Sequence, residues 1–277
     1  MRGDVTGNAD LYYLQGLARG LAGALLFALP LLMTMEMWWL GGFTMDRLRL
    51  LIFLVMSLPM LLGISYYVGF EPTFDLVDEV LDALAAFAIG FLLSAAALAL
   101  MGVLTASGSP TEMIGQVALC AVPAAIGALL AGKQFSTRGI EQQDRDARGF
   151  WRALFLMAVG AVFLAFNVAP TEEMVLISHL MGLGHALALM AISLLALHML
   201  VYALGFPGEE RRREAGGSWL TFATYTLPGY AVALGISLFC LWIFGRLDGV
   251  ALHEQASMMV VLGFPASLGA ATARLVV

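Results

Sequence analysis

Charged residues are scarce along the whole of this sequence, and that scarcity excludes a water-soluble protein. Only 12% of the 277 residues are charged and 61% are hydrophobic, whereas a soluble domain contains about 25% charged residues. The longest polar stretch, residues 132–148, is too short to bury a core of its own. The composition therefore predicts an integral membrane protein with no folded soluble domain.

Cysteine and lysine are almost missing. The two cysteines, Cys120 and Cys240, lie inside apolar runs, so we expect neither a disulfide framework nor a zinc site. The net charge of −6 argues against a nucleic-acid partner. One lysine stands against thirteen arginines in a sequence rich in Ala, Leu and Gly, which is typical of GC-rich bacterial genomes. We therefore expect a protein of the bacterial inner membrane, with no cofactor.

What the sequence has in abundance is apolar segments of membrane-spanning length. A bilayer core of about 30 Å requires about 20 apolar residues in a helix. Eight such segments are present, at residues 17–41, 48–69, 80–104, 112–132, 150–168, 173–205, 219–245 and 253–276. The sixth is long enough to tilt or to continue beyond the membrane as one helix. The third and eighth are the least apolar at their starts, so seven spans is the alternative. The expected fold is an all-α polytopic bundle.

The basic residues orient this bundle, because cytoplasmic loops carry an excess of Arg and Lys. With a cytoplasmic N-terminus, the inner connections contain Arg2, Arg19, Lys133, Arg138, Arg145, Arg148, Arg152, Arg211, Arg212, Arg213 and Arg274. The outer connections contain only Arg47, Arg49 and Arg246. This bias predicts eight spans with both termini in the cytoplasm. Residues 1–16 are polar and lack the cationic region of a signal peptide, so we expect a cytoplasmic lead-in.

Two pairs of segments resemble each other and suggest a duplication. The fourth and eighth spans each begin with an acid, have proline eleven residues later, and then a glycine: Glu112, Pro123 and Gly127 in one, Glu254, Pro265 and Gly269 in the other. The first and fifth spans open alike, with Ala-Arg-Gly at residues 18–20 and 147–149. We therefore expect two parallel four-helix halves, residues 17–132 and 150–277, joined by a basic cytoplasmic loop, residues 133–149.

Carboxylates gather at the predicted outer ends of these spans. They are Asp46, Glu112, Glu172, Glu173 and Glu254 at the starts of even-numbered spans, and Glu36 near the end of the first. Capping explains some of them, since Ser-Pro-Thr-Glu at residues 109–112 fits a capping box. Glu36 lies in the last turns of the first span, where the helix dipole disfavours an anion. An ionisable group inside a span is a functional hypothesis by default.

Oxygen-rich clusters of this kind suit cations. Amide oxygens of Asn167 and Gln116 accompany the acids Glu36, Glu112, Glu172, Glu173 and Glu254 in the predicted outer site. Ca²⁺ takes 6–8 oxygen ligands, whereas a proton requires only a chain of carboxylates. Prolines can open helix carbonyls to a polar cavity, and the expected hinge or helix-breaking residues are Pro110, Pro123, Pro170 and Pro265.

Two further groups of residues are predicted to take part in cation transport. His179 is seven residues after Glu172 and on the same helix face, which makes it a proton-linked group, although a span histidine is more often hydrogen-bonded to a neighbouring helix. A cytoplasmic acidic face forms either a solvated helix start or a cation-collecting vestibule; its members are Asp75, Asp78, Glu79 and Asp82.

Two resemblances bear on these residues. The stretch Asn167–Glu173, NVAPTEE, resembles the Asn…Pro-Glu signature of the cation/calcium exchanger superfamily, with an inserted threonine. In that superfamily the Glu and Asn coordinate the transported ion, but the repeats there are inverted. Over the whole chain, the eight-span layout with its Pro-Thr-Glu loops resembles an uncharacterised family of bacterial integral membrane proteins. That likeness implies the topology and no activity.

These observations favour a cation transport protein, carrier or channel, with Ca²⁺ or H⁺ as the ion. The first alternative is a non-transporting scaffold or sensor subunit that assembles with a partner. The second is an intramembrane enzyme with Glu172 and His179 as its acid–base couple, against which stands the lack of HExxH, GxSxG or a usefully spaced Cys–His pair. The expected partners are an inorganic cation and membrane lipid. Small-residue faces also permit a homo-oligomer.

Overall fold

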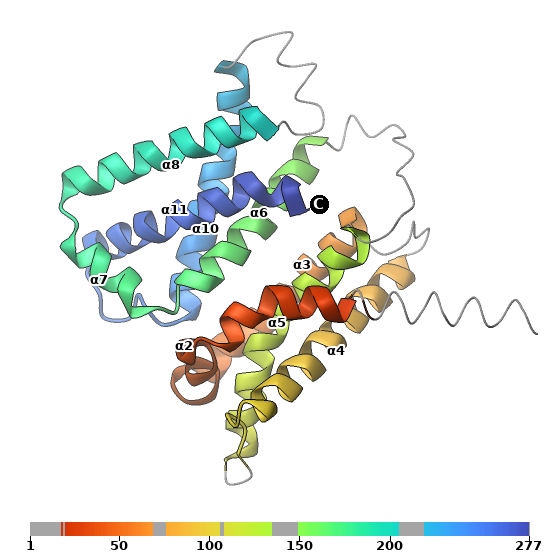
Figure 1. Ribbon diagram of the computed structural model, residues 1–277. Coiled ribbons are helices and arrows are strands. Elements are labelled where there is room, and N and C mark those ends of the chain that lie inside the picture. The colour runs from red at the N-terminus through yellow and green to blue at the C-terminus, as the bar shows by residue number, and fades with distance from the viewer. Residues whose placement is uncertain are drawn as a thin grey trace, which may run out of the picture. The chain divides into compact units, whose positions relative to one another are not determined.

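The computed structural model describes residue 18 and residues 20–68, 76–105, 108–134, 149–204 and 219–276 (Figure 1). Every regular element in these ranges is a helix. Seven of the described helices are long and apolar enough to cross a membrane, and a bent pair of shorter helices raises the number to eight if it counts as one span. The predicted all-α polytopic fold is confirmed to that extent.

The chain divides into two compact units, Met1–Gly139 with Val277, and Ile140–Val276. The boundary falls within the loop 133–149 that the basic residues predict between the halves. Each unit has its own set of packed helices, and each is described separately below.

The first unit opens with a bent pair of helical segments. A helix Gly20–Leu32 is followed after a bend of 87° by a short segment, which contains α2 (Met35–Trp39) and the π-helix η1 (Leu40–Thr44). Three long helices follow in this unit: α3 (Arg47–Val68), α4 (Leu76–Leu100) and α5 (Pro110–Gln134).

The second unit has the same order of long and short segments. It begins with α6 (Gly149–Val168), followed by the short helix α7 (Glu172–Leu180). Three long segments follow: α8 (Leu183–Leu204), the span Trp219–Ile243 with the π-helix η2 (Phe222–Thr226) and α10 (Leu227–Ile243), and α11 (Leu252–Val276). Figure 1 shows α7 as the short green helix between α6 and α8.

Two predicted spans are broken, and here the sequence-based expectation of continuous helices was wrong. The segment 17–41 bends at Thr34, and the segment 173–205 stops at Leu180 and restarts at Leu183. The second break begins at Met181, whose backbone is extended (φ −85°, ψ 122°). The over-long sixth segment is therefore a short helix plus a span, and not one tilted helix.

The last helix of each unit is its centre. Residues 117–130 of α5 are buried without exception, and α5 packs against the other segments of its unit. In the second unit α11 packs against α6, α7, α8 and α10, and Figure 1 shows it running between α6 and α8. Small side chains on these helices let their neighbours approach closely, as membrane helix pairs require.

Close helix crossings in both units depend on paired glycines. Gly127 of α5 meets the backbone of Gly23, and Gly269 of α11 meets the backbone of Gly160 on α6. A Cβ on Gly127 would collide with the carbonyl oxygen of Gly23. In the pair Gly160–Gly269, a Cβ on either residue would likewise collide with the carbonyl oxygen of the other. The first and last helices of each unit thus cross at a glycine pair.

The helix that precedes the central helix ends in the same way in both units. Gly102 after α4 has φ +74° and Gly245 after α10 has φ +72°. The next residue in each case donates its N–H to a carbonyl five residues back, Val103 to Leu98 and Arg246 to Leu241, both at 2.9 Å. Only glycine adopts this left-handed conformation without a steric penalty, so glycine stops each helix.

Several predicted features lie outside the described residues: the lead-in 1–16, most of the loop 133–149, Asp75, and the basic residues Arg211, Arg212 and Arg213. For Asp78 the structure describes the backbone alone.

Candidate functional site

The junction between the first and short helices is built identically in the two units. Thr34 precedes α2 and Thr171 precedes α7, both with extended backbone. Each threonine hydroxyl donates a hydrogen bond of 2.8 Å to a carbonyl three residues back, that of Leu31 or Val168. This back-bond occupies a carbonyl at the end of the first helix and so favours a turn there over another helical residue.

Arg246 fastens the α10–α11 connection to the junction of the second unit. Its guanidinium donates to Glu172 Oε1 at 2.7 Å and to the carbonyl of Pro170. The Arg246 side chain is only 17% exposed, whereas that of Glu172 is 73% exposed. A carboxylate held by a guanidinium is a poor ligand for a second cation. Glu172, the acid predicted to hold the ion, is thus occupied by a protein cation.

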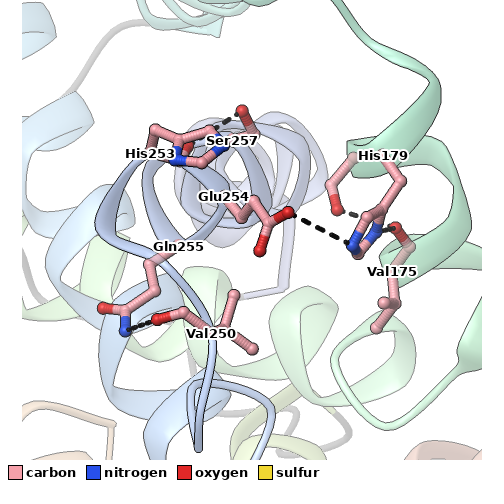
Figure 2. Close-up of polar contacts among 8 residues, drawn as sticks. Val175, His179, Val250, His253, Glu254, Gln255 and Ser257 are labelled. Carbon is pink, nitrogen blue, oxygen red and sulfur yellow. Dashed lines mark hydrogen bonds and ion pairs between the residues drawn. The ribbon is translucent and has the colours of Figure 1, made fainter.

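His179 and Glu254 face each other between α7 and the first turn of α11. His179 Nε2 lies 4.0 Å from Glu254 Oε1, and the two side chains are 47% and 38% exposed. Figure 2 shows the Glu254 carboxylate directed at the imidazole, while His253 lies on the other side of the α11 start. Both side chains of a pair that joins the short helix to the central helix are therefore partly exposed.

The hydrogen bonding of His179 determines which nitrogen can accept a proton. Nδ1 lies 2.8 Å from the carbonyl oxygen of Val175. A carbonyl only accepts hydrogen bonds, so Nδ1 carries the hydrogen in the neutral ring and Nε2 is the basic nitrogen. Protonation at Nε2 thus places a positive N–H opposite the Glu254 carboxylate.

Glu112 and Asp46 act as helix caps. Glu112 Oε2 accepts the backbone N–H of Ser109 at 3.3 Å, which is the acid half of the predicted capping box. Asp46 Oδ1 accepts the N–H of Leu48 at 2.7 Å at the start of α3. For these two carboxylates the capping interpretation is confirmed.

Glu36 has a different setting from the one predicted. The bend at Thr34 places it in the first turn of α2, where the helix dipole favours an anion. The argument that Glu36 stands at an unfavourable helix end was therefore wrong. Its side chain is half-buried.

The two amides of the predicted ion site are directed elsewhere. Asn167 Nδ2 donates to the carbonyl of Phe163 in its own helix at 2.7 Å. Gln116 is 4% exposed and packs against the backbone of Gly42 in η1. Neither contact brings an amide oxygen to a carboxylate.

Within the described residues, no group of three or more His, Cys, Asp or Glu side chains is arranged to hold a metal ion. A shallow pocket is present on the exposed surface of α7, lined by Glu172, Glu173, Val175, Leu176 and His179. All five belong to a single helix, so this pocket encloses nothing. The multi-oxygen calcium site is not assembled among the described residues of either unit.

The prolines predicted to break helices have two roles. Pro110 is the first residue of α5, and Pro170 is buried in the α6–α7 junction, as expected for residues at helix boundaries. Pro123 and Pro265 lie inside α5 and α11, which continue past them. These two free a carbonyl in the preceding turn without ending the helix.

The acidic face on α4 is more enclosed than a vestibule requires. Glu79 is 8% exposed and Asp82 is half-buried, and both interact with other groups of the protein. These contacts favour a structural role for both residues.

Arg47 and Arg246 are exceptions to the predicted excess of basic residues on the cytoplasmic side. Both make hydrogen bonds that stabilise local structure. Arg47 donates to the carbonyls of Gly41 and Gly42 at 3.2 and 3.1 Å, at the end of η1. Arg246 is engaged at the α6–α7 junction, as described above. Their charges neutralise helix ends and a carboxylate.

His198 has the structural setting expected of a histidine within a span, a hydrogen bond to a neighbouring segment. Its Nδ1 lies 2.9 Å from Thr226 Oγ1 in η2, 28 residues away in the sequence. This confirms that a span histidine bonds to a neighbouring helix. The only available signal was a histidine in an apolar run, and nothing in the sequence identified its partner.

The chain belongs to the family described as "Putative integral membrane protein (DUF2391)", whose model matches residues 16–277. The expected membership of an uncharacterised integral membrane family is thereby confirmed. No curated protein and no solved structure matches the chain. The matches thus give no support to the exchanger likeness of residues 167–173.

Proposed function

We propose that this protein is a proton transport protein of the bacterial inner membrane, built from two parallel repeats. The observation that carries the proposal is the contact of His179 on a short, hinged helix with Glu254 at the start of the central helix. Proton relays in membrane transporters use such Asp, Glu and His groups. Repeats with interrupted helices are a recurring architecture of secondary transporters.

Matched residues in the first and short helices of the two units support the duplication. One common shift along the sequence relates Gly23 to Gly160, Thr34 to Thr171 and buried Met37 to buried Met174. This register differs from the one suggested by the Ala-Arg-Gly strings. In this register, the glycine at the helix crossing and the threonine at the junction in one unit align with their counterparts in the other unit.

The remaining helices are related by nearly the same shift. Buried Ser57 corresponds to buried Ser193, and left-handed Gly102 corresponds to left-handed Gly245. In the central helices, Glu112, Pro123 and Gly127 correspond to Glu254, Pro265 and Gly269. The difference in residue number between corresponding positions stays almost constant from the first helix to the last. This supports the origin of both units from the duplication of one ancestral unit.

The repeat also favours eight spans and a parallel arrangement. The bent first pair of the first unit corresponds to α6 and α7, and α6 is long enough to span. Four spans per unit return the chain to its starting side, so both units have the same orientation. The arginine bias then places the termini in the cytoplasm and the short helices at the outer face.

The proposed mechanism uses the hinges at both ends of α7. Nε2 of His179 accepts a proton from external water, and the cation so formed attracts the Glu254 carboxylate across the present 4.0 Å. Contraction of this distance draws α7 onto α11 and closes the outer end of the unit. Transfer of the proton to Glu254 neutralises the pair and releases α7 again, and loss of that proton from Glu254 toward the inner side restores the starting carboxylate.

Between the two favoured ions, the geometry supports H⁺ over Ca²⁺. A calcium ion requires 6–8 oxygens around one centre. Glu172 is paired with Arg246, Glu112 caps α5, and Asn167 bonds to its own helix. A single histidine–carboxylate pair is sufficient for a proton.

Proton flux into liposomes tests this function. Purified full-length protein is reconstituted with a trapped pH-sensitive dye, and a potassium diffusion potential drives the ions. We expect Glu254→Gln and His179→Gln to lower the flux about tenfold or more, because each removes one proton-carrying partner. Added Ca²⁺ should not be transported.

His253→Gln is the matched control, since His253 is exposed next to Glu254 and lies away from the pair. It should leave the flux unchanged. Equal flux in wild-type protein and both pair variants would reject the proposal, and so would calcium uptake that depends on Glu254.

A further inference from the structure

Polar side chains gather between α8 and the span Trp219–Ile243, at residues that the His179–Glu254 pair does not include. Thr226 and Ser193 are fully buried and Tyr230 is 5% exposed. His198 bonds to Thr226. We call His198, Thr226, Tyr230 and Ser193 the polar seam. His198 is half-buried and the other three are buried, and placing such side chains within a membrane span has a cost unless they are hydrogen-bonded or functional.

Part of the seam is incompletely hydrogen-bonded. The Tyr230 hydroxyl lies beside Ser193 but completes no hydrogen bond among the described residues, and the Ser193 hydroxyl donates to the carbonyl of Leu189 at 2.7 Å. The hydroxyl of Thr221, which immediately precedes η2, is buried and likewise has no partner in the described part of the chain. Buried hydroxyls of this kind are typical of places where water or a transferred proton completes the network.

Comparison with the first unit shows that the seam is specific to the second. In the alignment of the repeats, His198 corresponds to Leu62, Thr226 to Ala83, and Tyr230 to Phe87. Ser193 alone has a polar counterpart, Ser57, which bonds within its own helix. The second unit thus has polar groups where the first has apolar ones, at positions that lie on one pair of neighbouring helices.

The backbone differs at the same place. Thr226 ends the π-helix η2, whereas the corresponding part of the first unit belongs to the regular helix α4. π-Helical turns are rare and occur frequently at functional sites. The distorted turn and the gained hydroxyl of Thr226 therefore coincide at the partner of His198.

We propose that the polar seam is a second proton-binding site, located toward the inner end of the second unit. This inference rests on the proposed proton transport and adds to it a proton-binding site near the cytoplasmic side. In the eight-span topology α8 ends, and the span Trp219–Ile243 begins, on the cytoplasmic side, and His198 lies near that end of α8. His198 binds a proton and becomes an imidazolium whose Nδ1–H donates to the Thr226 oxygen, and it then releases one proton toward the cytoplasmic side. Atoms and charge balance at each step, because one proton enters and one leaves.

The described surroundings of His198 are aromatic and hydroxylic. The rings of Tyr202 and Phe222 contact the imidazole, at centroid distances of 6.2 and 5.3 Å. The titratable groups on the packed elements η2, α10 and α11 are Tyr225, Tyr230, Cys240, His253 and Glu254, and the side chain of Arg274 is outside the described residues. The Thr226 hydroxyl on η2 is thus one group on the neighbouring segment that contacts this imidazole.

Nitrogen-15 NMR of histidine-labelled, full-length protein in nanodiscs tests the site directly. The chain has four histidines, so single His→Gln variants at 179, 185 and 253 assign the His198 signal. We expect acidification to convert this signal from neutral to cationic imidazole. Thr226→Val should alter the Nδ1 signal. An imidazole that remains one neutral tautomer throughout would overturn the proposal.

Flux provides the second readout. Replacing the seam by the residues of the first unit, His198→Leu, Thr226→Ala and Tyr230→Phe, should lower proton flux about tenfold or more. His185→Gln, which changes an exposed histidine on the same helix, should not. If Glu254→Gln abolishes flux and the seam variant does not, this inference fails while the proposed function stands. If wild-type protein carries no proton, the NMR titration alone decides whether His198 is a proton site.

Discussion

Gly160 and Gly269 meet backbone to backbone where α6 crosses α11, and neither residue has space for a side chain. Gly23 and Gly127 form the same contact between the first helix and α5. In each unit the contact sets how closely the first helix approaches the central one. Glycine pairs of this kind permit close packing in the absence of a hydrophobic driving force in lipid.

Gly160→Ala should therefore destabilise the protein. The added methyl group meets a backbone carbonyl that cannot rotate away, and overpacking of this kind costs about 1–3 kcal/mol. The measurement is the free energy of unfolding in detergent. Gly235→Ala in α10 is the control, because a Cβ there contacts nothing within 4 Å. A Gly160→Ala protein as stable as that control would contradict the close crossing.

Arg246 and Glu172 should contribute unequally to stability. Glu172→Gln is expected to cost less than about 1 kcal/mol, because an exposed carboxylate is well solvated without its partner. Arg246→Met should cost about 1–3 kcal/mol, because it leaves the carbonyl of buried Pro170 without this donor. Unfolding of both single variants and the double variant measures the difference. A larger loss for Glu172→Gln would show that the ion pair, and not the carbonyl contact, holds the connection.

Thr111 and His253, which correspond in the alignment of the repeats, should lie on the same side of the membrane. Both are exposed, and the native Cys120 and Cys240 are fully buried and so unreactive. Thr111→Cys and His253→Cys should both react with a membrane-impermeant maleimide on intact cells, whereas Trp219→Cys should react only after permeabilisation. Labelling of the two positions from opposite sides would indicate inverted repeats.

The apolar segments could be predicted from the sequence because a span requires an uninterrupted run of such residues. The breaks within them could not. Thr34 and Met181 both lie within segments that are long and apolar enough on average to be taken as single spans. The bend at Thr34 coincides with its hydroxyl bond to Leu31, which composition does not reveal. Glu36 was misplaced for the same reason, since its position in a helix depended on an unseen break.

The first helix of each unit could not be aligned from sequence letters alone. Short Ala-Arg-Gly strings suggested one register, while the glycine crossing and the threonine junction favour another. Identical letters are common by chance in a chain of Ala, Leu and Gly. Packing distinguishes Gly160, which has no room for a Cβ, from Gly235, which has ample room. For the acids, the sequence placed Glu172 near His179 but gave no sign that Arg246 would hold Glu172.

One comparison of two proteins tests proton flux through Glu254 directly. Wild-type protein and Glu254→Gln, reconstituted at equal density in liposomes with a trapped pH-sensitive dye, are given the same potassium diffusion potential. The predicted result is rapid acidification with wild-type protein and a rate near that of empty liposomes with Glu254→Gln. Equal rates for the two proteins, or a wild-type rate no higher than that of empty liposomes, would contradict the account.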